Sequence, residues 1–383
     1  MSSESGRGAP TPVLLAITSL RRGGAERQLI EIVAGIDRDR WMPIVALCDP
    51  TDEYGLQLDS TRIHDLRSAD ASTPMTGVRL ARIMVRERIE VVHSFGGLLN
   101  FYACVAARMT GGRRVVSSVL AGIPDRRDVT LERLSRPWTH ALVVNSVGIR
   151  DQLTRRAGYP ADAIDVIPNG IDVRRFRPLD RAERDASRTR WSLNGPTLVV
   201  MARVTAEKNH PGIVEALGLL RGAGALPPNA TVLFAGHAPD AALRETLDRR
   251  IEALGLRGVV RFLGSVREPE SLLGAADGAV LVSHYEGMSN AVLEAMACGT
   301  PVVVSPGADR DVVVRDGIDG VRAAGVDARC IAEAISRFFA LDDVAREHLG
   351  RTARARVESF TVEAMVARME SVWSRVLDRP PTP

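Results

Sequence analysis

The chain has 383 residues, of which 45% are hydrophobic and 25% charged, and its formal net charge is +3. This length is too great for one ordinary core and predicts two domains, while the composition is typical of a soluble globular protein. A net charge so small and evenly spread argues against nucleic acid as a partner. The cysteines lie among apolar residues without metal-ligand spacing, which favours buried free thiols and a reducing cytoplasm: Cys48, Cys104, Cys298 and Cys330.

The first twelve residues, MSSESGRGAPTP, are small and polar and predict a disordered tail over 1–12. The apolar run that follows, VLLAITSL, is shorter than the roughly 18 residues of a membrane span and lacks a cleavage-site pattern. We therefore expect no transmembrane or secretory segment and a cytoplasmic location.

Short apolar runs alternate with amphipathic stretches from residue 13 onward. Residues 13–17 read as a buried strand, and residues 25–36 carry apolar side chains at helical spacing. Further strands are predicted at 42–48, 89–95, 113–119, 140–146 and 163–169. Strands rich in Val, Ile and Leu that alternate with helices are typical of a parallel sheet covered on both faces.

The alternation breaks over residues 169–196, which are charged and poor in strand formers, and then restarts. Strands are predicted again at 196–204, 230–237, 259–265, 278–284 and 300–306. We expect one doubly wound domain over 13–178, a second over 190–360, and a C-terminal helix over 361–383 that packs back across the domains. Ligands of such sheets collect at the carboxyl ends of the strands, here in a cleft between the domains.

The first candidate site is the turn between the first strand and the first helix, LRRGGAE, which contains Gly23 and Gly24. Two glycines allow a tight turn and a close approach of the backbone, and the helix N-terminus behind them favours an anion. By itself this turn is equally consistent with a phosphate site and with a plain connection.

The second candidate is the pair Arg203 and Lys208, directly after the strand TLVVMA. Lys208 is the only lysine among 50 basic residues. An arginine fork with a lysine point charge suits a diphosphate with adjacent oxygens. The alternative is a solvated basic loop in front of a helix that begins near Pro211.

The third candidate is the block EGMSNAVLEAMACGTPVVV, which begins at Glu286. Ser289 or Asn290 caps the predicted helix, and Glu294 lies about one turn inside it. The backbone amides of Met288–Asn290 lie between the two carboxylates. Because two acids repel an anion, sugar hydroxyl groups are better partners for them than phosphate is. The alternative is that the two residues have no role in binding, and are a capping carboxylate and an exposed glutamate of the helix.

In their order along the chain, GGAER, Arg203-x4-Lys208 and Glu286-x7-Glu294 followed by ACGTPVV resemble the retaining family-4 glycosyltransferases of the GT-B fold. VIPNGID at 166–172 resembles the link of that family into its second domain, and FAGHAP at 234–239 its nucleotide-facing glycine turn. The similarity extends from about residue 13 to residue 360. It implies an α/β fold with two Rossmann-like, doubly wound parallel-sheet domains that face each other across a cleft.

The resemblance implies roles for individual residues. Arg203 and Lys208 would hold the donor diphosphate and stabilise the departing nucleotide. Glu286 would bind the transferred sugar and Glu294 the ribose. The remaining positions would surround the diphosphate and the base with backbone groups: Gly23, Gly24, Gly236, Val266, Met288, Ser289 and Asn290. No cofactor and no metal are expected, because the cations replace a divalent ion.

Two positions depart from the family pattern. His93 is present after the strand IEVV, but Phe95 stands where the family often has a second histidine facing the sugar. His93 is therefore as consistent with a core histidine as with a catalytic one. The segment SPGADRDVVVRDG also deviates from the usual GG-x-x-E, with Asp311 near the place of the acid.

The sequence thus predicts transfer of a sugar, with retention, from a nucleotide diphosphate (a UDP-sugar is favoured) to a glycan or lipid-linked hydroxyl in cell-envelope or exopolysaccharide synthesis. The alternative is a nucleotide-sugar epimerase or a non-catalytic binding module of the same fold. A peripheral contact with the inner face of the cell membrane is a further expectation, from arginines of the first domain: Arg21, Arg22, Arg126, Arg127, Arg155 and Arg156.

Overall fold

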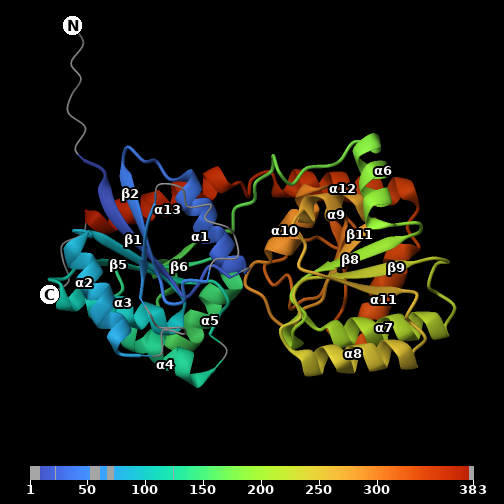
Figure 1. Cartoon of the computed structure of the whole chain (residues 1–383), viewed down its shortest axis with the longest axis horizontal. Helices are drawn as coiled ribbons and strands as arrows, with labels where there is room; N and C mark the ends of the chain where they lie inside the picture. Colours follow the sequence, from blue (N-terminus) through green and yellow to red (C-terminus); the bar gives the residue numbers. More distant parts are fainter. Residues whose placement is uncertain (1–8, 22, 52–60, 67–72, 124, 379–383) are drawn as a thin grey trace, which may run out of the picture. The chain divides into compact units, whose positions relative to one another are not determined.

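The computed structural model describes residues 9–21, 23–51, 61–66, 73–123 and 125–378. The chain forms two compact units, Met1–Gly170 with Val362–Pro383, and Ile171–Thr361. Each unit has its own parallel sheet with helices on both faces, so the expected pair of doubly wound domains is confirmed (Figure 1).

The first unit contains a seven-stranded sheet in the order β3-β2-β1-β4-β5-β6-β7. Its strands are β1 (Thr11–Ile17), β2 (Trp41–Leu47), β3 (Arg62–Asp65), β4 (Val91–Phe95), β5 (Arg114–Val119), β6 (Ala141–Val144) and β7 (Ile164–Val166). Its helices are α1 (Gly24–Gly35), α2 (Met75–Arg86), α3 (Gly97–Met109), α4 (Arg126–Ser135), α5 (Val147–Ala157) and α13 (Val362–Leu377), with 3-10 turns η1 (Arg136–Trp138) and η2 (Ala161–Ala163).

The C-terminal helix α13 packs on the first unit. Met365, Val366, Met369, Val372 and Trp373 are all buried in one cluster with apolar residues of α1, β1 and β2. Figure 1 shows this helix, in red, beside α1 and the sheet of that unit. The apolar stripe read from the sequence is therefore the core-facing side of α13.

The boundaries differ from the sequence-based ones at two places. Thr11 and Pro12 belong to β1 and pair in parallel with β2, so the predicted tail is too long at its inner end, while residues 1–8 lie outside the described part. The chain enters the second unit at Ile171 instead of beyond residue 178. The reason is that Ile171 and Phe176 are buried in the core of the second unit.

The second unit contains a six-stranded sheet in the order β10-β9-β8-β11-β12-β13. Its strands are β8 (Thr197–Met201), β9 (Thr231–Ala235), β10 (Val260–Gly264), β11 (Gly278–Leu281), β12 (Val302–Val304) and β13 (Gly320–Arg322). Its helices are α6 (Arg181–Trp191), α7 (His210–Gly222), α8 (Ala241–Ala253), α9 (Pro269–Ala275), α10 (Asn290–Ala297), α11 (Ala328–Phe339) and α12 (Asp343–Val357), with the 3-10 turn η3 (Ala206–Lys208).

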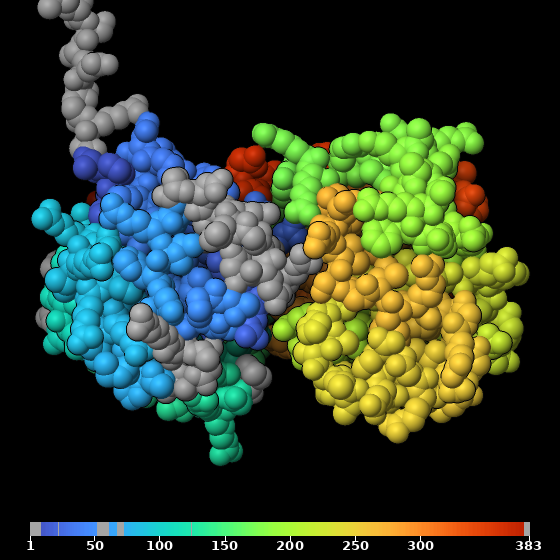
Figure 2. Space-filling model, viewed as in Figure 1, coloured from blue at the N-terminus to red at the C-terminus, as the bar shows by residue number. Residues whose placement is uncertain are grey.

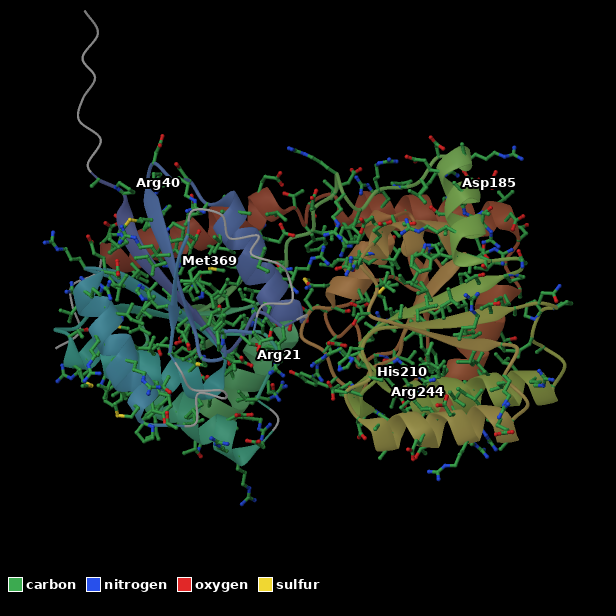
Figure 3. The ribbon with its side chains drawn as sticks, viewed as in Figure 1. Arg21, Arg40, Asp185, His210, Arg244 and Met369 are labelled. Carbon is green, nitrogen blue, oxygen red and sulfur yellow. The ribbon has the colours of Figure 1, made fainter. Side chains whose placement is uncertain are left out.

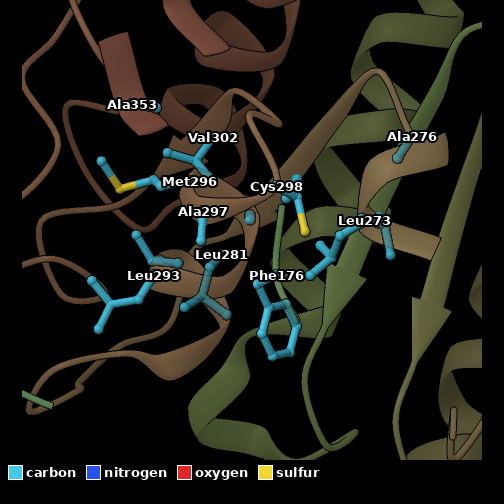
Figure 4. Packing of buried hydrophobic residues seen from close by; sticks show 14 of the residues in the cluster. Phe176, Leu273, Ala276, Leu281, Leu293, Met296, Ala297, Cys298, Val302 and Ala353 are labelled. Atoms are coloured by element: carbon cyan, nitrogen blue, oxygen red, sulfur yellow. The ribbon is translucent and has the colours of Figure 1, made fainter. Parts of the chain in front are cut away.

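Two apolar layers hold the sheet of the second unit. One layer packs α9, α10 and α12 around Phe176, Leu273 and Met296 (Figure 4). The other packs α7 and α11 on the opposite face, and α7 and α8 (yellow) lie on the outside of the unit in Figure 2. Because β8 lies between β9 and β11, the strand order reverses at β8, and the loops after β8 and β11 meet at that point.

Three of the free cysteines, Cys48, Cys104 and Cys298, are buried, and Cys330 is partly exposed. Within the ranges that the structure describes, no helix is long and apolar enough to cross a membrane.

Candidate functional site

The turn after β8 ends in Lys208 and is held by the next residue, Asn209. Asn209 has a left-handed backbone, with φ of 56°, and its Oδ1 accepts a hydrogen bond from the Gly212 amide at 3.2 Å to cap α7. Its Nδ2 donates to the carbonyl oxygens of Val282 at 3.3 Å and Val326 at 2.8 Å. Since Val282 directly follows β11, one side chain fixes the Lys208 turn against the neighbouring strand.

The loop after β11 brings Glu286 to Lys208. The Lys208 ammonium donates a hydrogen bond to Glu286 Oε1 and forms an ion pair with it, and the Ser283 hydroxyl donates to the same oxygen at 2.8 Å. The two charged side chains are 19% and 15% exposed. The His284 amide also donates to the Glu207 carbonyl oxygen at 2.9 Å, so backbone and side chains join the two loops.

Helix α10 begins beside this pair. The Ser289 hydroxyl accepts from the Val292 amide at 3.4 Å, which caps the helix as predicted. A hollow at this helix end is lined by Gly287, Met288, Ser289, Ala308, Asp311 and Val313, among others. Amide groups of a first helical turn and the helix dipole favour an anion in such a place.

Arg203 lies after β8 but not in the Lys208–Glu286 pair. Its side chain is 55% exposed and is 3.8 Å from the Glu207 carboxylate. Gly236, after β9, lies against the same loop, because a Cβ atom at Gly236 would be 2.0 Å from the Ala202 carbonyl oxygen. Val266, after β10, is partly buried against the core.

Glu294 is only 5% exposed, on helix α10. Burial, followed by the negative charges of Glu294 and Glu270, raises the pKa of the Cys298 thiol to about 12. Cys298 is therefore a neutral buried thiol next to the second acid of the motif.

His210 follows Lys208 closely and is completely buried. Burial, and then the charge of Lys208, lower its pKa to about 4. Its ring packs on Phe234 with centroids 4.8 Å apart, Phe234 packs on Phe262, and the Arg244 guanidinium lies 3.6 Å from the Phe262 ring centroid. Figure 3 shows His210 and Arg244 in this part of the second unit. Because His210 stays neutral near pH 7, Lys208 carries the positive charge at this turn.

Gly23, Gly24 and His93 belong to the first unit. Gly23 is the N-cap of α1 with an extended backbone, and a Cβ atom there would be 2.2 Å from Glu26 Oε2. A residue with a Cβ atom at position 23 would therefore overlap the Glu26 carboxylate of the first helical turn, and the Glu26 side chain would have to move.

His93 is completely buried and both its ring nitrogens have partners. Nε2 is 2.8 Å from the Ser118 hydroxyl, and the Trp373 indole N–H donates to Nδ1 at 3.2 Å. Phe95 stacks on the imidazole with centroids 4.4 Å apart. Burial lowers the pKa of His93 to about 3. Of the two interpretations that the sequence left open, this environment favours a neutral core histidine.

Sequence reasoning missed the residues that hold the candidate acid in place. Ser283 holds the carboxylate of Glu286 through one hydrogen bond, and Asn209 holds the Lys208 turn through three. No motif spacing marks either residue. The described ranges contain no group of three His, Cys, Asp or Glu side chains arranged to hold a metal ion.

Two family descriptions match the chain: "Glycosyltransferase Family 4" over residues 22–175 and "Glycosyl transferases group 1" over residues 182–356. A D-inositol 3-phosphate glycosyltransferase of Actinosynnema mirum is 34% identical over 249 residues. That match covers 62% of this chain and 58% of the relative, so the chain spans less than two thirds of its length.

Two further comparisons extend over almost the whole chain. The alpha-maltose-1-phosphate synthase of Mycolicibacterium smegmatis is 27% identical over 396 residues, which cover 92% of this chain and 96% of that protein. Anabaena HepE, solved in complex with UDP and glucose, has a TM-score of 0.82 at 20% identity, with coverage of 95% and 100%. This last likeness concerns the fold alone.

Proposed function

The chain belongs to the family-4 glycosyltransferases of the GT-B fold, and we propose that it transfers a sugar from a nucleotide-diphosphate donor to a hydroxyl acceptor with retention of configuration. The observation that carries the proposal is the ion pair of Lys208 and Glu286 beside the N-terminus of α10. A cation, a carboxylate and the N-terminus of a helix at one sheet edge match the phosphates and hydroxyl groups of a nucleotide sugar.

Lys208 and Arg203 are the proposed electrostatic partners of the diphosphate. Preorganised cations stabilise the charge that develops on the departing nucleotide, and this is a major source of rate enhancement. Lys208 is a compact ammonium that can bind a phosphate oxygen while it still faces Glu286. Arg203 is largely exposed and extends the positive charge along the same loop. We infer that these two cations do the work of a metal ion, so that the reaction is metal-independent.

Glu286 is the proposed partner of the transferred sugar. Its carboxylate already accepts from Lys208 and Ser283, which leaves the second oxygen for a sugar hydroxyl. Glu294 is proposed for the ribose, and the amides of Met288–Asn290 for the diphosphate. Gly236 and Val266 would line the base through backbone groups. Retention by front-face substitution needs no protein nucleophile, so we leave the buried His93 out of the chemistry.

The donor that we propose is a UDP-sugar, supported by the UDP and glucose in the similar HepE structure. For the acceptor, the names of two relatives point to a phosphorylated sugar or cyclitol, beside the cell-envelope glycan or lipid-linked acceptor that the sequence suggests. We also propose that the enzyme works in the cytoplasm and contacts the membrane peripherally through arginines of the first unit.

A panel of nucleotides tests the donor site. UDP, GDP, ADP, UDP-glucose, UDP-N-acetylglucosamine and GDP-mannose are added in turn, and the thermal midpoint is measured. A ligand at a hundredfold excess over its Kd adds about 2.7 kcal/mol to the native state, and we expect this for UDP and at least one UDP-sugar. If none of the six ligands raises the midpoint, the proposed function is wrong.

Turnover separates the transferase from its alternative. The stabilising donor is incubated alone and then with D-inositol 3-phosphate or with a glycan acceptor. A glycosylated acceptor supports the transferase, whereas an epimerised sugar in the donor-only sample supports the epimerase. Binding without either product supports a non-catalytic module.

A further inference from the structure

The segment that follows β12 lies directly against the loop that carries Glu286. The Glu286 amide donates to the Gly307 carbonyl oxygen at 2.9 Å, and the Ser305 hydroxyl donates to the Ser283 carbonyl oxygen at 2.8 Å. A Cβ atom at Gly307 would be 2.4 Å from the His284 carbonyl oxygen, so the two backbones touch. The position of Glu286 therefore depends on where the 305–314 segment lies.

A buried acid holds that segment. Asp309 is 5% exposed and accepts hydrogen bonds from the amides of Val313 at 2.9 Å and Val314 at 3.0 Å. Arg322, in β13, forms an ion pair with Asp309. Its guanidinium also donates to the Val314 carbonyl oxygen at 3.0 Å and the Asp309 carbonyl oxygen at 3.1 Å. The Arg322 guanidinium thus closes the 309–314 turn, because it binds both the Asp309 carboxylate and two backbone carbonyl oxygens of the turn.

The turn contains a conformation that needs such support. Val312 has a left-handed backbone with φ of 53°, which is unfavourable for a β-branched residue. Val312 is 49% exposed as a residue, so tight packing around it does not explain the conformation. The conformation of Val312 is instead held by hydrogen bonds of the residues around it. Asp309 accepts from the amides of Val313 and Val314, and Arg322 donates to the carbonyl oxygens of Asp309 and Val314.

We propose that Asp309 and Arg322 are positioning residues for Glu286. Their ion pair fixes the 309–314 turn, the turn fixes the Gly307 carbonyl oxygen, and that oxygen fixes the Glu286 amide beside Lys208. The effect on turnover rests on the proposed function, because it needs Glu286 to contact the transferred sugar. The effect on the Glu286 loop does not rest on it.

Hydrogen exchange of the full-length protein without ligand tests the positioning directly. In Asp309→Asn and in Arg322→Lys, we expect the amides of residues 284–290 to exchange on the order of tenfold faster, because loss of the ion pair frees the loop locally. Exchange in α13, which lies in the other unit, should not change. Unchanged exchange over 284–290 in both variants overturns the proposal.

A neighbouring ion pair supplies the matched control. Asp319 is completely buried, and its carboxylate accepts hydrogen bonds from Arg315 Nε at 2.6 Å and Nη2 at 2.7 Å. These bonds do not reach the 283–289 loop. Asp319→Asn should lower the thermal midpoint while the exchange of 284–290 stays at the wild-type level. Equal acceleration in Asp319→Asn and Asp309→Asn would reduce the role of Asp309 to general stability and contradict the proposal.

Kinetics with UDP-glucose give the second readout. Asp309→Asn should lower kcat on the order of tenfold with a smaller change in KM, because a displaced Glu286 loses a contact made in the transition state. If wild type does not use UDP-glucose, the UDP-sugar that the nucleotide panel identifies takes its place. A wild-type protein that uses no UDP-sugar contradicts the proposed donor, and the exchange experiment then decides the positioning alone. An unchanged kcat in an active protein contradicts the link to turnover.

A substitution in the turn avoids the risk that a buried variant does not fold. Proline cannot adopt the backbone of Val312, because its ring fixes φ near −65°, whereas asparagine tolerates left-handed positions. We expect Val312→Pro to accelerate exchange over 284–290 and Val312→Asn to leave it unchanged. Equal exchange in these two variants would show that the turn does not position Glu286.

Discussion

The ammonium group of Lys208 and the carboxylate of Glu286 form an ion pair between the loops that follow β8 and β11. These strands are neighbours in the sheet, although the two residues are far apart in the sequence. The pair therefore lies at the point where the strand order reverses, which is where ligands of open parallel sheets bind. The chain has one lysine, and it is this residue.

Replacing Lys208 tests whether an ammonium is required. Lys208→Ala should lower kcat/KM about 10- to 100-fold, the worth of a hydrogen bond to a charged group. Lys208→Arg should lose about tenfold or more, since a planar guanidinium does not fit a site made for a compact cation. Steady-state transfer assays with the donor found by the nucleotide panel measure both variants.

A surface arginine supplies the control for this substitution. Arg250 pairs with Glu215 on the exposed faces of α7 and α8. Arg250→Lys should leave turnover unchanged, because this pair is solvated and outside the site. Wild-type turnover in Lys208→Arg would show that any cation suffices there.

Replacing Asn209 by aspartate tests how the Lys208 turn is held. Aspartate keeps the oxygen that caps α7 but cannot donate to the carbonyl oxygens of Val282 and Val326. We expect a loss of about 1–3 kcal/mol in the free energy of unfolding, because one buried and one partly buried acceptor lose their donor. The shift of the unfolding midpoint in urea measures it.

Asn229 is the matched control for Asn209. It too has a left-handed backbone, with φ of 59°, but it is exposed. Asn229→Asp should change the midpoint by less than about 0.5 kcal/mol, as surface substitutions do. Equal losses at both positions would assign the effect to the backbone conformation and not to the hydrogen bonds.

Glu132 gives the first unit a predictable pH dependence. Burial raises its pKa from 4.5 to about 7, although hydrogen bonds from Asn100 and Tyr159 act in the opposite direction. Between these pH values the folded protein binds more protons than the unfolded chain, so this group destabilises the fold as pH rises. The free energy of unfolding can fall by at most about 1.4 kcal/mol per pH unit through this one group.

The Glu132→Gln variant removes that term. Thermal midpoints at pH 5 and pH 8 should show that wild type loses more stability than the variant as pH rises. His93 acts in the opposite direction, because its lowered pKa makes stability increase with pH. Its contribution is the same in both proteins and drops out of the difference between them. Parallel pH profiles would mean that Glu132 is not protonated in the fold near neutral pH.

Gly236→Ala tests the close contact at the end of β9. An added Cβ atom would be 2.0 Å from the Ala202 carbonyl oxygen, which is backbone and cannot turn aside. We expect a loss of about 1–3 kcal/mol and weaker binding of UDP, measured by calorimetry and thermal unfolding.

Gly222 is the control in the same unit. It ends α7, and a Cβ atom there meets nothing within 4 Å. Gly222→Ala should be neutral or stabilise the protein by up to about 1 kcal/mol, because alanine favours the helix. A neutral Gly236→Ala would contradict the contact with Ala202.

Much of the fold was predictable because its strands are continuous apolar runs. The buried strands β4, β8 and β9 lie within the predicted segments. The edge strands β3 and β13 were missed, since RIHD is polar and GVR is only three residues long. Edge strands carry such residues because one side is open to solvent.

The sequence by itself determined the family, the two parallel-sheet units and the motif residues Lys208, Glu286 and Ser289, because spacing and order along the chain carry this information. Only the tertiary structure decided that Lys208 and Glu286 are paired, that His93 is enclosed by Ser118 and Trp373, and that Asp309 and Arg322 hold the turn beside Glu286. These contacts join strands and helices distant in sequence. They depend on which side chains the sheet order makes neighbours, and no local pattern records that.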